Sequence, residues 1–239
     1  MAKGFYGTYR LPFALEIPGL RLSLAPEGDG FLYRRVQGDE CVEKLIFLGE
    51  RATVKLLPVE PVNLPGGLAQ QLHISFKKPL LLPPRGNALV YLVFPVEVGV
   101  FVKAGTLYKV VDIFTLARQK LTFVGDFEKG RVSKYYESDL HTEIPPVSPL
   151  KEGVLRLRLR NRGGEWQNVE RVSIPAEDIK IFYGPNLVSM TAEGVMMKGE
   201  IVKLEVKETP LKRGMKPSAE LYRPGAFKKM TKKLLVEVE

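Results

Sequence analysis

The feature that most constrains this fold is a two-residue alternation of apolar and polar side chains along much of the chain. It is clearest in residues 153–160, GVLRLRLR, and it recurs between turn sequences such as PEGDG, LPGG and PPRGN. Because successive side chains of a β-strand point to opposite faces, this period predicts strands. Strands are expected at residues 20–24, 44–57, 72–76, 90–94, 106–114, 120–127, 154–159, 169–174, 179–183 and 200–208.

Many short strands between turns predict an all-β fold of the antiparallel β-sandwich type. With 239 residues the chain is long enough for one large sandwich or two smaller ones. The Pro-rich passage at residues 142–153, TEIPPVSPLKEG, disfavours helix and forms a stiff connector. We therefore expect an N-terminal β domain over residues 1–143 and a C-terminal β domain with a basic tail over residues 153–239. A single domain over residues 1–239 is the alternative.

Helical periodicity is confined to the C-terminal end. Phe227, Met230, Leu234 and Val238 fall on one face of a helix, and Pro224–Gly225 just before them suits a helix start. The same residues also fit a helix to about residue 233 followed by a strand, LLVEVE. A short C-terminal helix is expected, and both extents stay open.

The positive charge is concentrated in two tracts. The net charge is +9, and residues 154–164 hold four arginines and no acid. Residues 212–233 hold eight basic residues against Glu220 alone, whereas the chain outside these tracts, apart from two acids at its end, is neutral. A focused cationic patch is typical of proteins that bind anionic partners. The candidate patch comprises Arg156, Arg158, Arg160, Arg162, Lys228, Lys229, Lys232 and Lys233.

The arginines of this patch have two interpretations. Leu155, Leu157 and Leu159 are expected to face the core, so the alternating arginines share the other face. If Glu165, Glu170 or Glu205 lie across from them, the row is a surface ion-pair lattice that adds little stability. Such lattices suit the thermophile-like composition, with its many charged residues and 18 prolines. Without such acids, the arginines form half of a binding surface.

The usual signatures of catalysis and cofactor binding are absent. The chain has one cysteine, Cys41, and two histidines, His73 and His141, so multi-cysteine metal sites are excluded and no cofactor is expected. Cys41 lies in GDECVEK, where acids would raise its thiol pKa. His73 lies within a strand pattern and is expected to be structural. No phosphate-binding glycine loop and no nucleophile-elbow motif occurs.

Glu97 is the one acid with an unusual setting. It lies in the most apolar segment, FPVEVGVFV, and a sheet covered on both faces would require it to be paired or to have a raised pKa. A partly exposed glutamate paired with a lysine or arginine is the simpler interpretation. An alternative function as a β-sandwich hydrolase or carbohydrate-binding protein would use carboxylates such as Glu97 and the aromatic Trp166. A tryptophan in a turn is more often packed against the core.

The sequence carries no secretory signal and no apolar run long enough for a membrane helix, so a cytoplasmic location is expected. The partner is expected to be an acidic protein or another anionic surface, such as a membrane. Nucleic acid is less favoured, because no aromatic is interleaved on the arginine face of the strand itself. A homo-oligomer is compatible with the sequence.

Three segments carry a resemblance to a known family: YGTYRLP at residues 6–12, FPVEVGVFV at 94–102 and VERVSIPAEDIKIFYG at 169–184. Together they resemble an archaeal family that is known only as a domain of unknown function and that would cover nearly the whole chain. The resemblance implies no catalytic residues, and it points to a membrane-associated partner. Taken with the residues, it favours a non-enzymatic binding or accessory protein with a basic C-terminal third.

Overall fold

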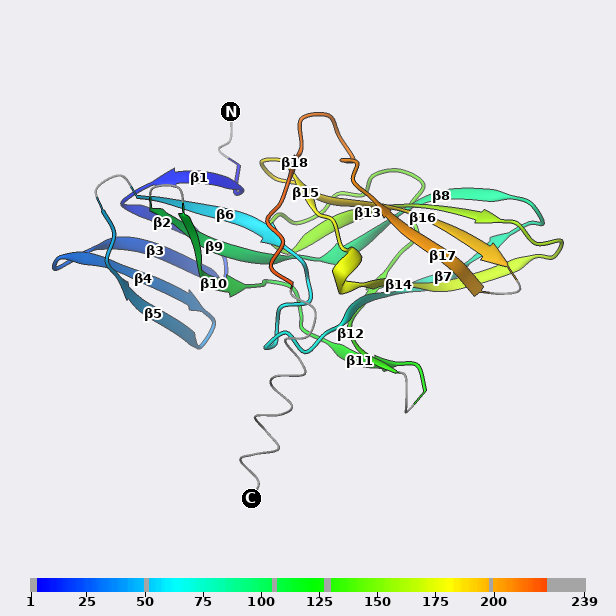
Figure 1. Ribbon diagram of the computed structural model, residues 1–239, viewed down its shortest axis with the longest axis horizontal. Helices are drawn as coiled ribbons and strands as arrows, with labels where there is room; N and C mark the ends of the chain where they lie inside the picture. The colour runs from blue at the N-terminus through cyan, green and yellow to red at the C-terminus, as the bar shows by residue number, and fades with distance from the viewer. Residues whose placement is uncertain (1–3, 50–51, 105–106, 127–129, 198–199, 223–239) are drawn as a thin grey trace, which may run out of the picture. The chain divides into compact units, whose positions relative to one another are not determined.

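The computed structural model describes residues 4–49, 52–104, 107–126, 130–197 and 200–222. It is all-β, as predicted, and its strands form four open, mostly antiparallel sheets (Figure 1). The described residues contain no α-helix, only a 3₁₀ turn at Ala176–Asp178. The expected C-terminal helix, with Phe227, Met230, Leu234 and Val238, lies outside the described residues.

Contacts divide the chain into two compact units. The larger contains residues 4–5, 58–98 and 113–222, and the smaller contains residues 6–57 and 99–112. The Pro-rich passage at residues 142–153, where the sequence suggests a boundary, lies inside the larger unit. The strands that follow this passage pair with strands that precede it, which is why the contacts do not divide the chain there.

The smaller unit contains a four-stranded antiparallel meander, β2–β3–β4–β5, of Phe13–Ile17, Leu20–Glu27, Gly30–Gln37 and Glu40–Ile46. Gly19, Gly28 and Gly38 take positive φ angles in its three tight turns, which glycine adopts without strain. The side chain of Arg35 is 4% exposed and bonds both Glu40 and Asp112. These bonds satisfy the buried guanidinium group of Arg35.

A second sheet of four strands has the order β1–β6–β9–β10, formed by Gly7–Arg10, Thr53–Val59, Glu97–Ala104 and Leu107–Phe114. The chain passes from one unit to the other within β6, β9 and β10. The single strand expected at residues 44–57 is wrong: residues 44–46 end β5, and β6 begins at Thr53. Alternation alone did not reveal the break between them.

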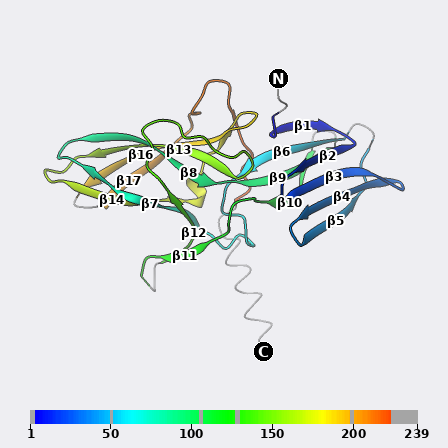
Figure 2. The ribbon, with the colours of Figure 1, turned by 180° about the vertical axis from the view of Figure 1, so that it is seen from behind.

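The larger unit contains two sheets that lie one over the other in both views (Figures 1 and 2). One has the order β11–β12–β7–β14, formed by Leu121–Val124, Arg131–Ser138, Gln71–Leu82 and Gln167–Pro175. The other has the order β18–β15–β16–β13–β8, with β17 also paired to β16. Its strands are Lys216–Pro217, Phe182–Tyr183, Val188–Met197, Glu152–Asn161, Asn87–Pro95 and, for β17, Glu200–Lys207.

Two strand pairs of this unit are parallel, β7 with β12 and β13 with β16, whereas the sequence pattern predicts antiparallel sheets. Parallel partners need long crossover connections, which short-range turn signals do not reveal. Buried side chains of both sheets form the core, among them Ile74 and Phe76 from β7. Gly194 of β16 leaves room for Leu159, since a Cβ there would lie 2.7 Å from Leu159 Cδ2.

Candidate anion-binding face

The arginines of β13 share one face of the larger unit's second sheet. Leu155, Leu157 and Leu159 are fully buried, which confirms that they face the core. The alternating side chains of Arg156, Arg158 and Arg160 therefore lie on the outer face, where Arg160 is exposed and the other two are partly exposed. The register predicted from the leucines is the one observed.

Strand pairing brings further cations and one aromatic ring onto this face, which we call the β13 face. Directly paired residues of neighbouring strands point to the same side of a sheet, so each arginine heads a row across it. The row of Arg156 contains Tyr91, Thr191 and Lys207. The row of Arg158 contains Leu89, Glu193 and Glu205, and the row of Arg160 contains Asn87, Val195 and Lys203.

Two carboxylates face these five cations. Glu205 pairs with Lys207 at 2.5 Å and with Lys203 at 3.7 Å, and the hydrogen bond from Lys207 lowers the pKa of Glu205. Glu193 lies beside Arg158 in register. No ion pair within the described part of the chain involves any of the three arginines. The face therefore retains an excess of positive charge on β13.

The acids that the sequence analysis named as partners for the arginines are mostly elsewhere. Glu205 is on the face, but its pairs are with lysines. Glu170 lies on β14 of the other sheet, where it accepts a bond from Asn168, and Glu165 lies in the turn after β13. Glu193, which the sequence pattern does not single out, lies beside the row. The ion-pair lattice is therefore not formed among the described residues.

The rest of the predicted patch is only partly described. Arg162 is exposed just after β13 ends. Lys228, Lys229, Lys232 and Lys233 lie outside the described residues. The segment before them is held by Glu60, a 3% exposed residue whose carboxylate accepts the backbone N–H groups of Leu221 and Tyr222 at 2.9 and 3.3 Å. The backbone at Leu221 and Tyr222 is therefore held to the residue that follows β6.

Thr191 has an unusual setting in the middle of the first row. Its side chain lies between Arg156 and Lys207 in register, and the residue is only 5% exposed. Its hydroxyl has no hydrogen-bond partner within the described residues. A buried polar group without a partner costs free energy, so most are satisfied. This hydroxyl is an unused donor among cations.

Glu97 is fully buried, with 0% exposure, and its chain neighbours Val96 and Val98 are also fully buried. Its carboxylate accepts bonds from the backbone N–H groups of Asn63, at 2.9 Å, and Leu64, at 3.2 Å. Lys134 Nζ donates to it at 3.1 Å. Both faces of the strand are thus covered, and the partly exposed glutamate expected by the simpler interpretation is wrong.

Lys134 is equally enclosed, with its side chain 1% exposed. Its three ammonium donors have three acceptors: Glu97, the carbonyl of Leu64 at 2.7 Å, and the side-chain oxygen of Gln119. Burial raises the pKa of Glu97 to about 7, against the opposing effect of Lys134 and the backbone donors, and burial lowers the pKa of Lys134. The pair therefore has a structural role and offers no acid to a substrate.

The remaining candidate groups do not assemble into a catalytic site. His73 Nδ1 lies 2.8 Å from Ser173 Oγ, and burial together with Arg171 lowers the histidine pKa. Cys41 is exposed, and no cluster of metal-ligating side chains occurs in the described segments. Trp166 is 66% exposed, so the expectation that it packs against the core is wrong. No helix long and apolar enough to span a membrane is found in the same segments.

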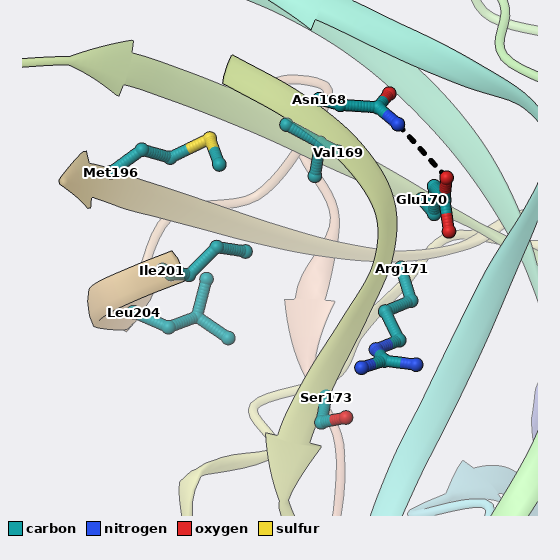
Figure 3. A pocket seen from close by; sticks show the side chains of 8 residues that line it. All are labelled: Asn168, Val169, Glu170, Arg171, Ser173, Met196, Ile201 and Leu204. Atoms are coloured by element: carbon teal, nitrogen blue, oxygen red, sulfur yellow. Dashed lines mark hydrogen bonds between the residues drawn. The ribbon is translucent and has the colours of Figure 1, made fainter. Parts of the chain in front are cut away.

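A groove of about 470 Å³ lies between β14 and the strands β16 and β17 (Figure 3). Its apolar side chains are Val169, Met196, Ile201 and Leu204, and its polar ones include Arg171 and Ser173. Glu170 is the single carboxylate among its lining side chains, and it is bonded to Asn168 at 2.9 Å. The groove therefore lacks the pair of carboxylates that glycoside hydrolysis requires.

Comparison with known proteins identifies a family. A family model described as "protein of unknown function (DUF432)" matches residues 5–238. The chain belongs to this family. No curated protein and no solved structure matches it. The family resemblance inferred from the sequence is thereby confirmed, and the family brings no established site, so the function must be argued from the β13 face itself.

Sequence reasoning missed several members of this face, among them Tyr91, Thr191, Glu193 and Lys207. Tyr91 alternates with Val90 and Leu92, which are buried, and this phase could have marked it as outward-facing. Its place beside Arg156 depends on the pairing of β8 with β13, which are far apart in the chain. The same holds for Thr191 and Glu193, which reach the face through a parallel pairing.

Proposed function

We propose that this protein is a binding module that holds an anionic partner on the β13 face. The observation that carries the proposal is the row of Arg156, Arg158 and Arg160, which share one exposed face without an ion pair in the described part of the chain. Alternate residues of a strand are roughly 7 Å apart. Three like charges at this spacing repel one another within a Debye length, and a polyanion would relieve that repulsion.

Arginine is well suited to this role. Its planar guanidinium presents five donors and binds carboxylate or phosphate groups through two parallel bonds. Lys203 and Lys207 border the row and add positive charge, although Glu205 neutralises part of it. Lys228, Lys229, Lys232 and Lys233 belong to the proposal as a second cationic segment, which follows the position held by Glu60.

Binding to three labelled or sedimentable anionic probes tests the proposal: an oligonucleotide, phosphatidylglycerol vesicles and polyglutamate, each at low and at physiological salt. The variant R156Q/R158Q/R160Q is expected to weaken binding at least tenfold and to lower the salt dependence, because fewer counterions are released. The control R21Q/K109Q/R118Q removes the same charge from exposed positions elsewhere and is expected to bind nearly as the unaltered protein does.

Equal losses in both variants would mean that only net charge matters, and the β13 face would lose its role. Undetectable binding to all three probes even at low salt would overturn the proposal as a whole. A further variant with glutamine at Lys228, Lys229, Lys232 and Lys233 measures the share of the C-terminal segment.

The alternative of a hydrolase acting through Glu97 finds no support, because that carboxylate is enclosed and held by Lys134. Carbohydrate binding retains one supporting observation, the 66% exposure of Trp166. Titration of the tryptophan fluorescence with soluble polysaccharides tests this second candidate, and an unchanged emission spectrum would count against it.

A further inference from the structure

The first row of the β13 face combines an aromatic ring, two cations and a hydroxyl that has no partner in the described part of the chain. Tyr91, Arg156, Thr191 and Lys207 follow one another in register across β8, β13, β16 and β17. These strands are adjacent in both views (Figures 1 and 2). His141 extends the row beyond β8, since it exchanges two backbone hydrogen bonds with Tyr91, at 2.8 and 3.0 Å. The row thus crosses four strands of the sheet.

The Thr191 hydroxyl is the first reason to place a ligand here. It is a buried polar group without a partner in the described residues, on a sheet face that is otherwise partly exposed. A hydroxyl can donate as well as accept, so it can donate to an anion that the two flanking cations attract. The side chain therefore fits the role of a neutral donor in an oxyanion site.

Arg156 and Lys207 flank this hydroxyl on either side. Neighbouring strands are about 4.8 Å apart, so the two cations start about 10 Å apart with Thr191 midway. Their long side chains can converge over the threonine. Lys207 Nζ is 2.5 Å from Glu205, and an ammonium group has two further donors. A tetrahedral phosphate, with several acceptor oxygens, matches this set better than a planar carboxylate does.

Tyr91 supplies a group that a lipid headgroup or an acidic peptide would not need. Its partly exposed ring lies beside Arg156, on the side away from Thr191. Proteins that bind single-stranded nucleic acid place bases on aromatic rings and phosphates on nearby cations. Tyr91 therefore marks a position for a base, and Arg156, Thr191 and Lys207 mark the position of the adjacent phosphate. Arg158 and Arg160 continue along β13 at a spacing close to that of successive phosphates in an extended single strand.

We infer that the anionic partner is a single-stranded nucleic acid, and that this row binds one nucleotide unit. Thr191, Arg156 and Lys207 hold its phosphate, and Tyr91 stacks against its base. This inference rests on the proposed function, because it names the partner of the same face. The neighbouring arginines bind the following phosphates without reading the base, so binding is expected to be tolerant of sequence.

The test compares two phosphodiester chains of about 12 nucleotides, one of thymidylates and one without bases, with polyglutamate as a third probe. The unaltered protein is expected to bind the chain with bases about tenfold more tightly than the abasic one. Y91A is expected to abolish that preference, whereas Y91F, which keeps the ring, is expected to retain it.

Thr191 is tested by removing only its hydroxyl. T191V is expected to bind both phosphodiester chains about tenfold more weakly and polyglutamate as before, because a donor to a charged group is lost. T191S keeps the hydroxyl and is expected to bind as the unaltered protein does. Melting temperatures at or above that of the unaltered protein show that the variants are folded.

The outcomes separate this inference from the proposed function. If R156Q/R158Q/R160Q loses binding but T191V and Y91A do not, the β13 face binds anions and the nucleotide site is overturned. Equal affinity for chains with and without bases, or tighter binding to phosphatidylglycerol vesicles than to the oligonucleotide, also overturns it. If the triple arginine variant keeps full affinity, both the inference and the proposed function fail.

Discussion

The charged groups of the larger unit occur in two contrasting settings, one buried and one on the surface. Inside it, Glu97 and Lys134 are enclosed, and their polar atoms have partners from backbone and side chains. On its surface, three arginines of β13 have no ion pair with any described residue, and the hydroxyl of Thr191 beside them has no partner there either. The interior pair stabilises the fold because it forms hydrogen bonds with the backbone groups of Asn63 and Leu64. The arginine row forms no comparable ion pairs with the described residues. We therefore assign it to binding and not to stabilising the fold.

The largest effect is expected from breaking the interior pair. K134M would leave the Glu97 carboxylate buried without its cation and is expected to lower the free energy of unfolding by about 3–5 kcal/mol. Denaturant unfolding followed by circular dichroism measures it. The double variant E97L/K134M removes both charges and should recover much of the loss. A cost below about 1 kcal/mol for the single variant would mean that the pair is not enclosed in solution.

A pH-dependent stability is expected next in size. Burial raises the pKa of Glu97 to about 7, so the folded state binds a proton more tightly than the unfolded state does. The stability that this proton contributes is present in full below the unfolded pKa and is lost as pH rises through 7, by roughly 3 kcal/mol. Unfolding curves at pH 5 and pH 8 measure it, and E97Q should be flatter between them. A stability that rises over this range in the unaltered protein but not in E97Q would reverse the argument.

Thr191 gives a smaller effect of the opposite sign. T191V removes a buried hydroxyl that has no partner among the residues the structure describes, so the free energy of unfolding is expected to rise by about 1 kcal/mol. Thermal unfolding measures it, with T191S as the matched control that keeps the hydroxyl. A destabilised T191V would show that the hydroxyl is satisfied in the free protein. Greater stability of T191V combined with weaker binding would show that the Thr191 hydroxyl contributes to ligand binding and lowers the stability of the free protein.

The smallest effect is expected from the arginine row itself. R156Q/R158Q/R160Q breaks no ion pair in the described residues, so each substitution is expected to change the free energy of unfolding by less than about 0.5 kcal/mol. Denaturant unfolding measures this beside the binding loss. A large loss of stability would place the arginines with Glu97 and Lys134 as parts of the fold.

The local features of this fold were predictable, and the neighbours of each strand were not. The alternation of Leu155, Leu157 and Leu159 with arginines predicted which side of β13 is buried, because the strand period is independent of topology. The apolar setting of Glu97 gave burial as one of two interpretations, and the favoured one, partial exposure, was wrong. Lys134 could not be named as its partner, since the contact joins residues far apart in the chain.

The same limit explains what was missed at the candidate site. The first row draws on four strands, β8, β13, β16 and β17, of which only β16 and β17 are consecutive in the chain. Tyr91 and Thr191 meet beside Arg156 through one antiparallel and one parallel pairing. A sequence shows which side chains point outward, but the composition of a sheet face depends on which strands lie side by side. Trp166 is exposed for a local reason, as it lies in the turn after β13.

The pairing of β13 with β8 and of β14 with β7 has a consequence for how the protein is made. During synthesis β7 and β8 emerge well before the strands that complete their sheets, so their edges stay open until residues 152–175 follow. Such non-local pairing slows folding and exposes unpaired strands to aggregation. Cleavage within residues 142–153 would yield two fragments that each hold strands of both sheets, β7, β8, β11 and β12 in the first and β13 to β18 in the second. These fragments are expected to regain the fold only by associating with one another.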